Sequence, residues 1–167
     1  MTLIIISFLI ITSYVGVMIY RKGIPYSISD TYYSLEHKVW FGFSMIATAL
    51  LLMPSILDRT PENFQFLAFL MCAGICFVGV APNFKAGMDR PVHIVSTVIS
   101  AVCSQLWLAL VITPYSLLVW LVWLAYEVIM VKKVWNGHFI NSFILTKPLF
   151  WAEAIAFLSV YIGLIFQ

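Results

Sequence analysis

Six apolar stretches, each close to 20 residues long, divide this 167-residue chain and constrain its fold more than any other feature. A helix rises about 1.5 Å per residue, so about 20 apolar residues cross the roughly 30 Å hydrocarbon core of a bilayer. We expect membrane-spanning helices at residues 2–20, 39–57, 64–82, 91–112, 115–131 and 149–166. The sequence therefore predicts an all-α, polytopic bundle of six transmembrane helices, built as a single domain over residues 1–167.

Charged residues are scarce, which excludes a soluble protein. Only 10% of the residues are charged and 63% are hydrophobic, whereas roughly a quarter of residues in soluble domains are charged. The composition predicts an integral membrane protein whose main partner is the lipid bilayer. No Arg-rich arm or RNA-binding motif is present, so we expect no nucleic-acid partner. Association of several copies of the chain into a homo-oligomer is a further possibility.

The basic residues are distributed unevenly among the connections between these stretches. Eight of the nine Lys and Arg residues fall in alternate connections, and Arg59 alone falls on the other side. The eight are Arg21, Lys22, Lys38, Lys85, Arg90, Lys132, Lys133 and Lys147. Because loops rich in Lys and Arg stay in the cytoplasm, this distribution predicts a multi-pass protein of the cytoplasmic membrane with both termini outside.

Small residues in the second and third spans mark the faces by which we expect these helices to meet. Helices in lipid associate through close backbone approach and hydrogen bonds, which small side chains permit. The residues concerned are Gly42, Ser44, Ala47 and Thr48 in the second span, and Ala73, Gly74 and Gly79 in the third.

The fourth span carries a stripe of polar residues on one helical face. His93, Thr97, Ser100 and Ser104 recur at i, i+4, i+7 and i+11, a spacing that places them above one another. One interpretation is hydrogen bonding between helices or back to carbonyl groups. The other is the wall of a polar cavity that opens to the cytoplasm, with His93, Thr97 and Ser100 as binding residues.

Two acidic residues lie inside predicted spans. Glu127 stands five residues before Lys132, and Glu153 stands five residues after Pro148, so both enter the bilayer from the basic side. An ionisable residue within a span usually faces the bundle interior or a water-filled cavity. We treat Glu127 and Glu153 as candidate binding residues for a proton or cation; the alternative is that both reach the head-group region.

The chain shows no strong catalytic motif. All three histidines, His37, His93 and His138, lie on the basic side and are weak candidates for metal ligands. None has a partner at HxxxH or HExxH spacing, so only the fold can bring them together. The first basic connection contains Ser29 and Asp30 before two tyrosines, which favours a short interfacial helix over a serine nucleophile. We therefore assign no catalytic residue and expect no cofactor.

One segment suggests a family. The stretch Phe77-Val78-Gly79-Val80-Ala81-Pro82-Asn83-Phe84, followed by His93 at the start of the next helix, resembles a pattern in the Frag/DRAM-like group of six-helix membrane proteins. The resemblance covers about 30 residues. It implies a six-helix bundle and a role for His93, which matches the helix-opening histidine, and it implies no particular chemistry.

Three kinds of function remain open on these observations. The first is binding or transport of a small solute, ion or lipid through a cytoplasm-facing polar site. The second is a membrane-embedded, metal-dependent hydrolase or transferase that uses the histidines and acids. The third is a structural or regulatory membrane subunit without activity of its own. The sequence favours the first and leans away from an enzyme. Acidic residues inside the membrane and a stripe of hydroxyl groups are enough for a binding site, whereas a metal enzyme would also need the separated histidines to meet.

Overall fold

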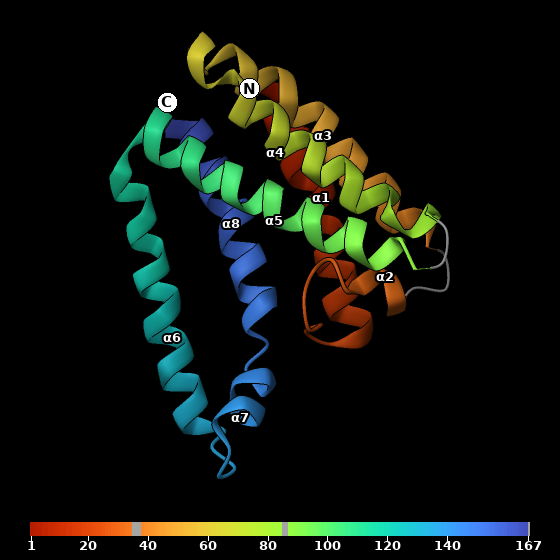
Figure 1. Ribbon diagram of the computed structural model, residues 1–167, viewed down its shortest axis with the longest axis vertical. Coiled ribbons are helices and arrows are strands. Elements are labelled where there is room, and N and C mark those ends of the chain that lie inside the picture. The colour runs from red at the N-terminus through yellow and green to blue at the C-terminus, as the bar shows by residue number, and fades with distance from the viewer. Residues whose placement is uncertain (35–37, 85–86, 167) are drawn as a thin grey trace.

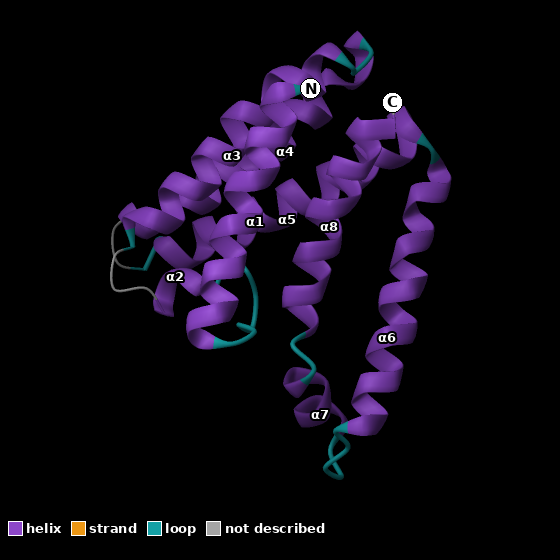
Figure 2. Cartoon of the chain, turned by 180° about the vertical axis from the view of Figure 1, so that it is seen from behind, coloured by secondary structure: helices purple, strands orange, loops and turns teal. Residues whose placement is uncertain are grey.

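The computed structural model describes residues 1–34, 38–84 and 87–166 and folds into a bundle of helices (Figures 1 and 2). Two residues named above, His37 and Lys85, lie outside the described residues. Every regular element in the described part of the chain is a helix. The expected all-α fold is therefore confirmed.

Long helices cross the bundle and short helices connect them. The long helices are α1 (Thr2–Lys22), α3 (Val39–Asp58), α4 (Gln65–Val80), α5 (Asp89–Trp107), α6 (Val119–Lys133) and α8 (Pro148–Phe166). The short helices are α2 (Thr31–Ser34) and α7 (Phe139–Leu145). Single turns extend three long helices: a 3₁₀ turn at Glu62–Phe64 precedes α4, a π turn at Leu108–Ile112 follows α5, and a 3₁₀ turn at Pro114–Leu118 precedes α6.

With these turns included, six segments of the described chain are long and apolar enough to span a membrane. They are Thr2–Lys22, Val39–Asp58, Glu62–Val80, Asp89–Ile112, Pro114–Lys133 and Pro148–Phe166. Each end lies within two residues of the end predicted from the sequence. The six-helix prediction is therefore confirmed. It could be made from the sequence because length and hydropathy are enough to identify a membrane-spanning helix.

Helices α1, α3, α4 and α5 pack closely in sequence order, and α8 lies against α1 and α5. Figure 1 shows α6 at the outer edge of the bundle, joined through α7 to the lower end of α8. Only Glu127 and Val131 are buried on α6. Both termini lie at the same end of the bundle (Figure 1), as six crossings require.

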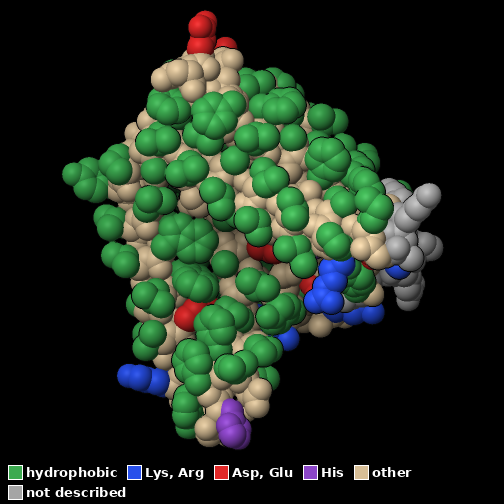
Figure 3. All heavy atoms as spheres, viewed as in Figure 1, with side chains coloured by type: hydrophobic (Ala, Val, Ile, Leu, Met, Phe, Trp, Pro, Cys, Tyr) green, Lys and Arg blue, Asp and Glu red, His purple; other side chains and the backbone are tan. Residues whose placement is uncertain are grey.

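Most basic residues of the described chain, though not Arg59, gather at the end opposite the termini. Arg21 and Lys22 occupy the last turn of α1, and Lys132 and Lys133 occupy the last turn of α6. Blue Lys and Arg atoms accordingly lie in the lower half of Figure 3, whose surface is otherwise mostly apolar. We call this the basic end. The side of the membrane that the basic end faces stays a prediction from the loop charges.

Glycines allow α4 to approach both of its neighbours closely. A Cβ atom added at Gly42 of α3 would lie 2.9 Å from the carbonyl oxygen of Gly79 on α4. A Cβ at Gly74 would lie 2.8 Å from both the Ser100 Cβ and the Ser96 carbonyl oxygen on α5. The predicted contacts of Gly42, Gly74 and Gly79 are therefore confirmed.

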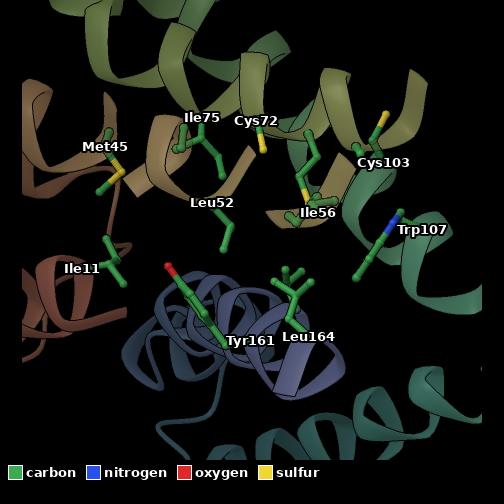
Figure 4. Packing of buried hydrophobic residues seen from close by; sticks show 14 of the residues in the cluster. Ile11, Met45, Leu52, Ile56, Cys72, Ile75, Cys103, Trp107, Tyr161 and Leu164 are labelled. Carbon is green, nitrogen blue, oxygen red and sulfur yellow. The ribbon is translucent and has the colours of Figure 1, made fainter. Parts of the chain in front are cut away.

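A polar joint fastens α8 to the rest of the core. Figure 4 shows Tyr161 and Leu164 of α8 projecting toward Leu52 of α3. The Ser7 hydroxyl of α1 lies 2.9 Å from the Thr48 carbonyl oxygen and 2.7 Å from the Tyr161 hydroxyl. A carbonyl can only accept, so Ser7 donates to Thr48 and Tyr161 donates to Ser7. This chain of two hydrogen bonds links α1, α3 and α8.

Gly74→Ala should destabilise the bundle by about 1–3 kcal/mol, because the new methyl group overlaps backbone of α5 that has no room to shift. Gly16→Ala is the matched control, since a Cβ at Gly16 meets nothing within 4 Å. The measurement is the free energy of unfolding in mixed micelles. Equal stability of the two variants would show that α4 and α5 are not in close contact at Gly74.

Candidate functional site

A cavity of about 240 Å³ lies between α5 and α8 and extends to α3, α4 and α6. Its lining is mainly apolar, from residues such as Leu52, Ile75 and Phe157. The polar side chains on the wall are Ser29, Thr97, Ser100, Ser104, Trp120 and Glu153. The cavity thus brings together three of the predicted binding residues, Thr97, Ser100 and Glu153.

The hydroxyl stripe of α5 forms one wall of this cavity. Thr97 donates to the His93 carbonyl oxygen at 2.8 Å, and Ser104 donates to the Ala101 carbonyl oxygen at 2.8 Å. Ser100 donates across the helix interface to the Met71 carbonyl oxygen of α4 at 3.0 Å. The hydrogen-bonding interpretation of the stripe is therefore confirmed. Thr97, Ser100 and Ser104 also line a cavity, but that cavity is mainly apolar and His93 is not part of its wall, and its opening to the cytoplasm stays a prediction.

Glu153 lies on the opposite wall and holds the connection between α1 and α2. Its Oε2 accepts the backbone N–H of Ser29 at 3.1 Å, and its Oε1 accepts the Ser29 hydroxyl at 2.9 Å. Beside it, the N–H of Phe150 donates to the Tyr26 carbonyl oxygen at 3.0 Å. The first N–H groups of a helix have no partner within the helix, so the first turn of α8 can donate to a carbonyl oxygen of this loop, as Phe150 does to Tyr26.

We call residues 23–30, which precede α2, the docking loop. Within it, the Asp30 N–H donates to the Ser27 hydroxyl at 2.9 Å. At its end, the hydroxyl of Thr31, the first residue of α2, donates to the Ile28 carbonyl oxygen at 2.6 Å. Ile28 is only 3% exposed, and with Ser29 it lines the cavity at the basic end. The expected short helix follows as α2. The contact of the loop with α8 was not foreseen from the sequence.

Glu127 occupies a separate position outside the cavity lining. Its side chain is 2% exposed, and its Oε2 accepts the Thr146 hydroxyl at 2.5 Å. The other oxygen, Oε1, has no hydrogen-bond partner. Thr146 follows α7, and its hydroxyl also lies 2.7 Å from the Phe143 carbonyl oxygen, so Glu127 and Phe143 share its single proton. Glu127 therefore ties α6 to the end of α7, and it does not join Glu153 at the cavity.

His93 and His138 lie apart from the cavity wall. His93 is half-buried one turn before Thr97 and interacts electrostatically with Asp30, but its side chain does not line the cavity. His138 is exposed before α7. Across residues 1–34, 38–84 and 87–166, no group of three or more His, Cys, Asp or Glu side chains is placed to hold a metal ion. His37 lies outside these ranges, so the three-histidine hypothesis stays a prediction.

Aromatic side chains connect the outer helix α6 to its neighbours. The Trp120 indole N–H donates to Gln105 Oε1 of α5 at 2.9 Å. Nearer the basic end, the rings of Tyr126 and Trp151 meet edge to face with centroids 5.5 Å apart. Trp120 also lines the cavity, so α6 contributes to the site through one residue that the sequence did not single out.

The fold defines the class of this protein: it is an integral membrane protein with multiple membrane-spanning helices. Comparison of the chain with protein-family models, curated proteins and solved structures gave no match. The resemblance to Frag/DRAM-like proteins therefore stays a prediction. What the chain does must be inferred from its own geometry.

Thr146→Val should destabilise the protein by about 1–3 kcal/mol, because it removes the hydrogen-bond partner of the buried Glu127 carboxyl. Replacing both partners with apolar groups leaves no unpaired polar atom, so Thr146→Val combined with Glu127→Met should recover most of that loss. The measurement is the free energy of unfolding of the four proteins in a double-mutant cycle. A double variant that is no more stable than Thr146→Val would contradict the assigned pairing.

Proposed function

We propose that this protein binds a small, mostly apolar molecule with a polar head in the cavity between α5 and α8. The observation that carries the proposal is the cavity itself, which combines an apolar lining with Thr97, Ser100 and Glu153 on its walls. Ligand pockets commonly have this composition, in which apolar side chains supply contact area and a few polar groups orient the ligand.

The cavity volume limits the size of the ligand. An engineered protein cavity of roughly 150 Å³ holds benzene. By the same space per atom, a cavity of about 240 Å³ takes about nine or ten non-hydrogen atoms. This corresponds to an alkyl chain of medium length with one head group, or to an equivalent part of a larger lipid.

Access to the cavity is from the bilayer. Val98 of α5 and Leu149 of α8 both line the cavity, yet they are 55% and 48% exposed on the outer surface. Their exposed faces belong to membrane-spanning segments, where the surrounding medium is lipid. An apolar molecule dissolved in the membrane therefore reaches the cavity between α5 and α8 without crossing water.

The proposal gives the two intramembrane acids different roles. Glu153 belongs to the binding site because it lines the cavity. Glu127 has a structural role, because its hydrogen bond with Thr146 holds the end of α7 against α6. Transport would need a second opening. The docking loop contributes Ile28 and Ser29 to the cavity wall at the basic end, where such an opening could form.

Filling the cavity tests the proposal. Ala156 lines the cavity on α8, so Ala156→Phe should abolish saturable binding of radiolabelled 1-octanol to the protein in lipid nanodiscs, measured by equilibrium dialysis against empty nanodiscs. The control is Ala125→Phe, which adds the same ring to an exposed position of α6 and should leave binding unchanged. The proposal fails when wild-type protein shows no saturable octanol binding, or when Ala156→Phe binds octanol as well as wild type.

A further inference from the structure

We infer that the cavity selects a ligand whose head group donates hydrogen bonds, and specifically a lipophilic amine that pairs with Glu153. The inference rests on the proposed binding function and names the class of molecule bound. It follows from the hydrogen-bonding groups on the cavity wall. The donors already bond to other groups of the protein, whereas some acceptors are still available to a ligand.

The side-chain donors on the cavity wall are all engaged. The hydroxyls of Thr97, Ser100 and Ser104 donate to backbone carbonyl oxygens. The Ser29 hydroxyl donates to Glu153, and the Trp120 indole N–H donates to Gln105. A hydroxyl carries one proton and an indole carries one N–H, so among the described lining residues no side-chain donor is left for a ligand.

Acceptor capacity remains on the same wall. Each hydroxyl oxygen has two lone pairs in addition to its proton, and a carboxylate has about four lone-pair sites. Ser29 occupies two of the sites on Glu153, and the backbone of Ile28 directs a further hydrogen bond at the same carboxylate. At least one site on Glu153 is therefore free to accept from a ligand.

The charge on the wall points in the same direction. In the described chain, no Lys, Arg or His side chain forms an ion pair with Glu153, and the charged group that acts on it is the acidic Asp30. Lys147, the basic residue just before α8, lies six residues before Glu153 in the sequence and forms no ion pair with it. An anionic head group would meet a carboxylate and hydroxyl oxygens whose protons are turned away. An ammonium head group brings up to three donors and a compensating charge.

The test compares three ligands of equal non-hydrogen atom number at neutral pH: octylamine, 1-octanol and heptanoate. Binding is measured by equilibrium dialysis to the protein in nanodiscs of zwitterionic lipid, so that surface potential does not enrich the amine. We expect octylamine to bind most tightly, octanol less tightly and heptanoate least.

Three variants identify the group responsible. Glu153→Gln keeps an oxygen that accepts from Ser29 but removes the charge, so octylamine affinity should fall about tenfold or more while octanol affinity changes little. Glu127→Gln removes an acid outside the cavity and should alter neither. Ser29→Ala frees a site on the Glu153 carboxylate, so octylamine affinity should be equal to or higher than that of wild type.

The outcomes separate the two proposals. If octanol binds saturably but heptanoate binds as tightly as octylamine, or Glu153→Gln leaves octylamine binding unchanged, the amine preference is wrong and the binding function stands. Loss of octylamine and octanol binding together in Glu153→Gln would also overturn the amine pairing, since it would show that the carboxylate is needed to keep the cavity intact and not to recognise the amine. If no ligand binds wild-type protein, both proposals are wrong.

Discussion

Hydrocarbon offers no water to a polar group, so a hydroxyl, carboxyl or indole N–H inside a membrane span requires a partner within the protein if its burial is not to cost free energy. The polar contacts of this chain follow from that requirement. Ser100 of α5 bonds to a carbonyl group of α4, Tyr161 of α8 bonds to Ser7 of α1, and Glu153 of α8 bonds to Ser29. Each of these bonds joins segments that are distant in sequence. The polar residues thereby determine which helices meet, in a medium where apolar contact alone discriminates little.

Two types of contact hold the helices together. Glycines bring α4 against α3 and α5 at Gly42, Gly79 and Gly74, and at these positions the helices have no room for a larger side chain. Helix α8 meets the same body through larger side chains, such as Tyr161 and Leu164. The cavity lies on the side where α8 faces α5. A mostly apolar cavity of this kind does not hold ordered water readily, and an apolar ligand gains contacts by filling it.

The sequence was sufficient for the parts of the fold that depend on local composition. Hydropathy predicted the six spans, and small residues predicted the contacts of Gly42, Gly74 and Gly79. The helical period placed Thr97 and Ser100 on one face, and the structure finds both on the cavity wall. These successes share a cause, because each depends on residues within one or two turns of the same helix.

The site as a whole could not be predicted, since it depends on directions and on long-range contacts. Glu127 and Glu153 enter the membrane at comparable distances from the basic end, but depth does not determine which neighbour a side chain faces. One contacts Thr146 and the other contacts Ser29, which is 124 residues away in the chain. The docking loop and α7 both fall in connections whose sequence carries no strong period, so their positions follow from the helices they contact.

The central claim is that Glu153 holds the docking loop against α8 and so closes one side of the cavity. NMR hydrogen exchange of the Ser29 amide tests it most directly, because this N–H donates to the Glu153 carboxylate. The account predicts slow exchange in the wild type and exchange at least about tenfold faster in Glu153→Leu. The Val134 amide, which donates to the Met130 carbonyl oxygen at the end of α6, should exchange equally in both proteins. Equal exchange of the Ser29 amide in wild type and Glu153→Leu would contradict the account.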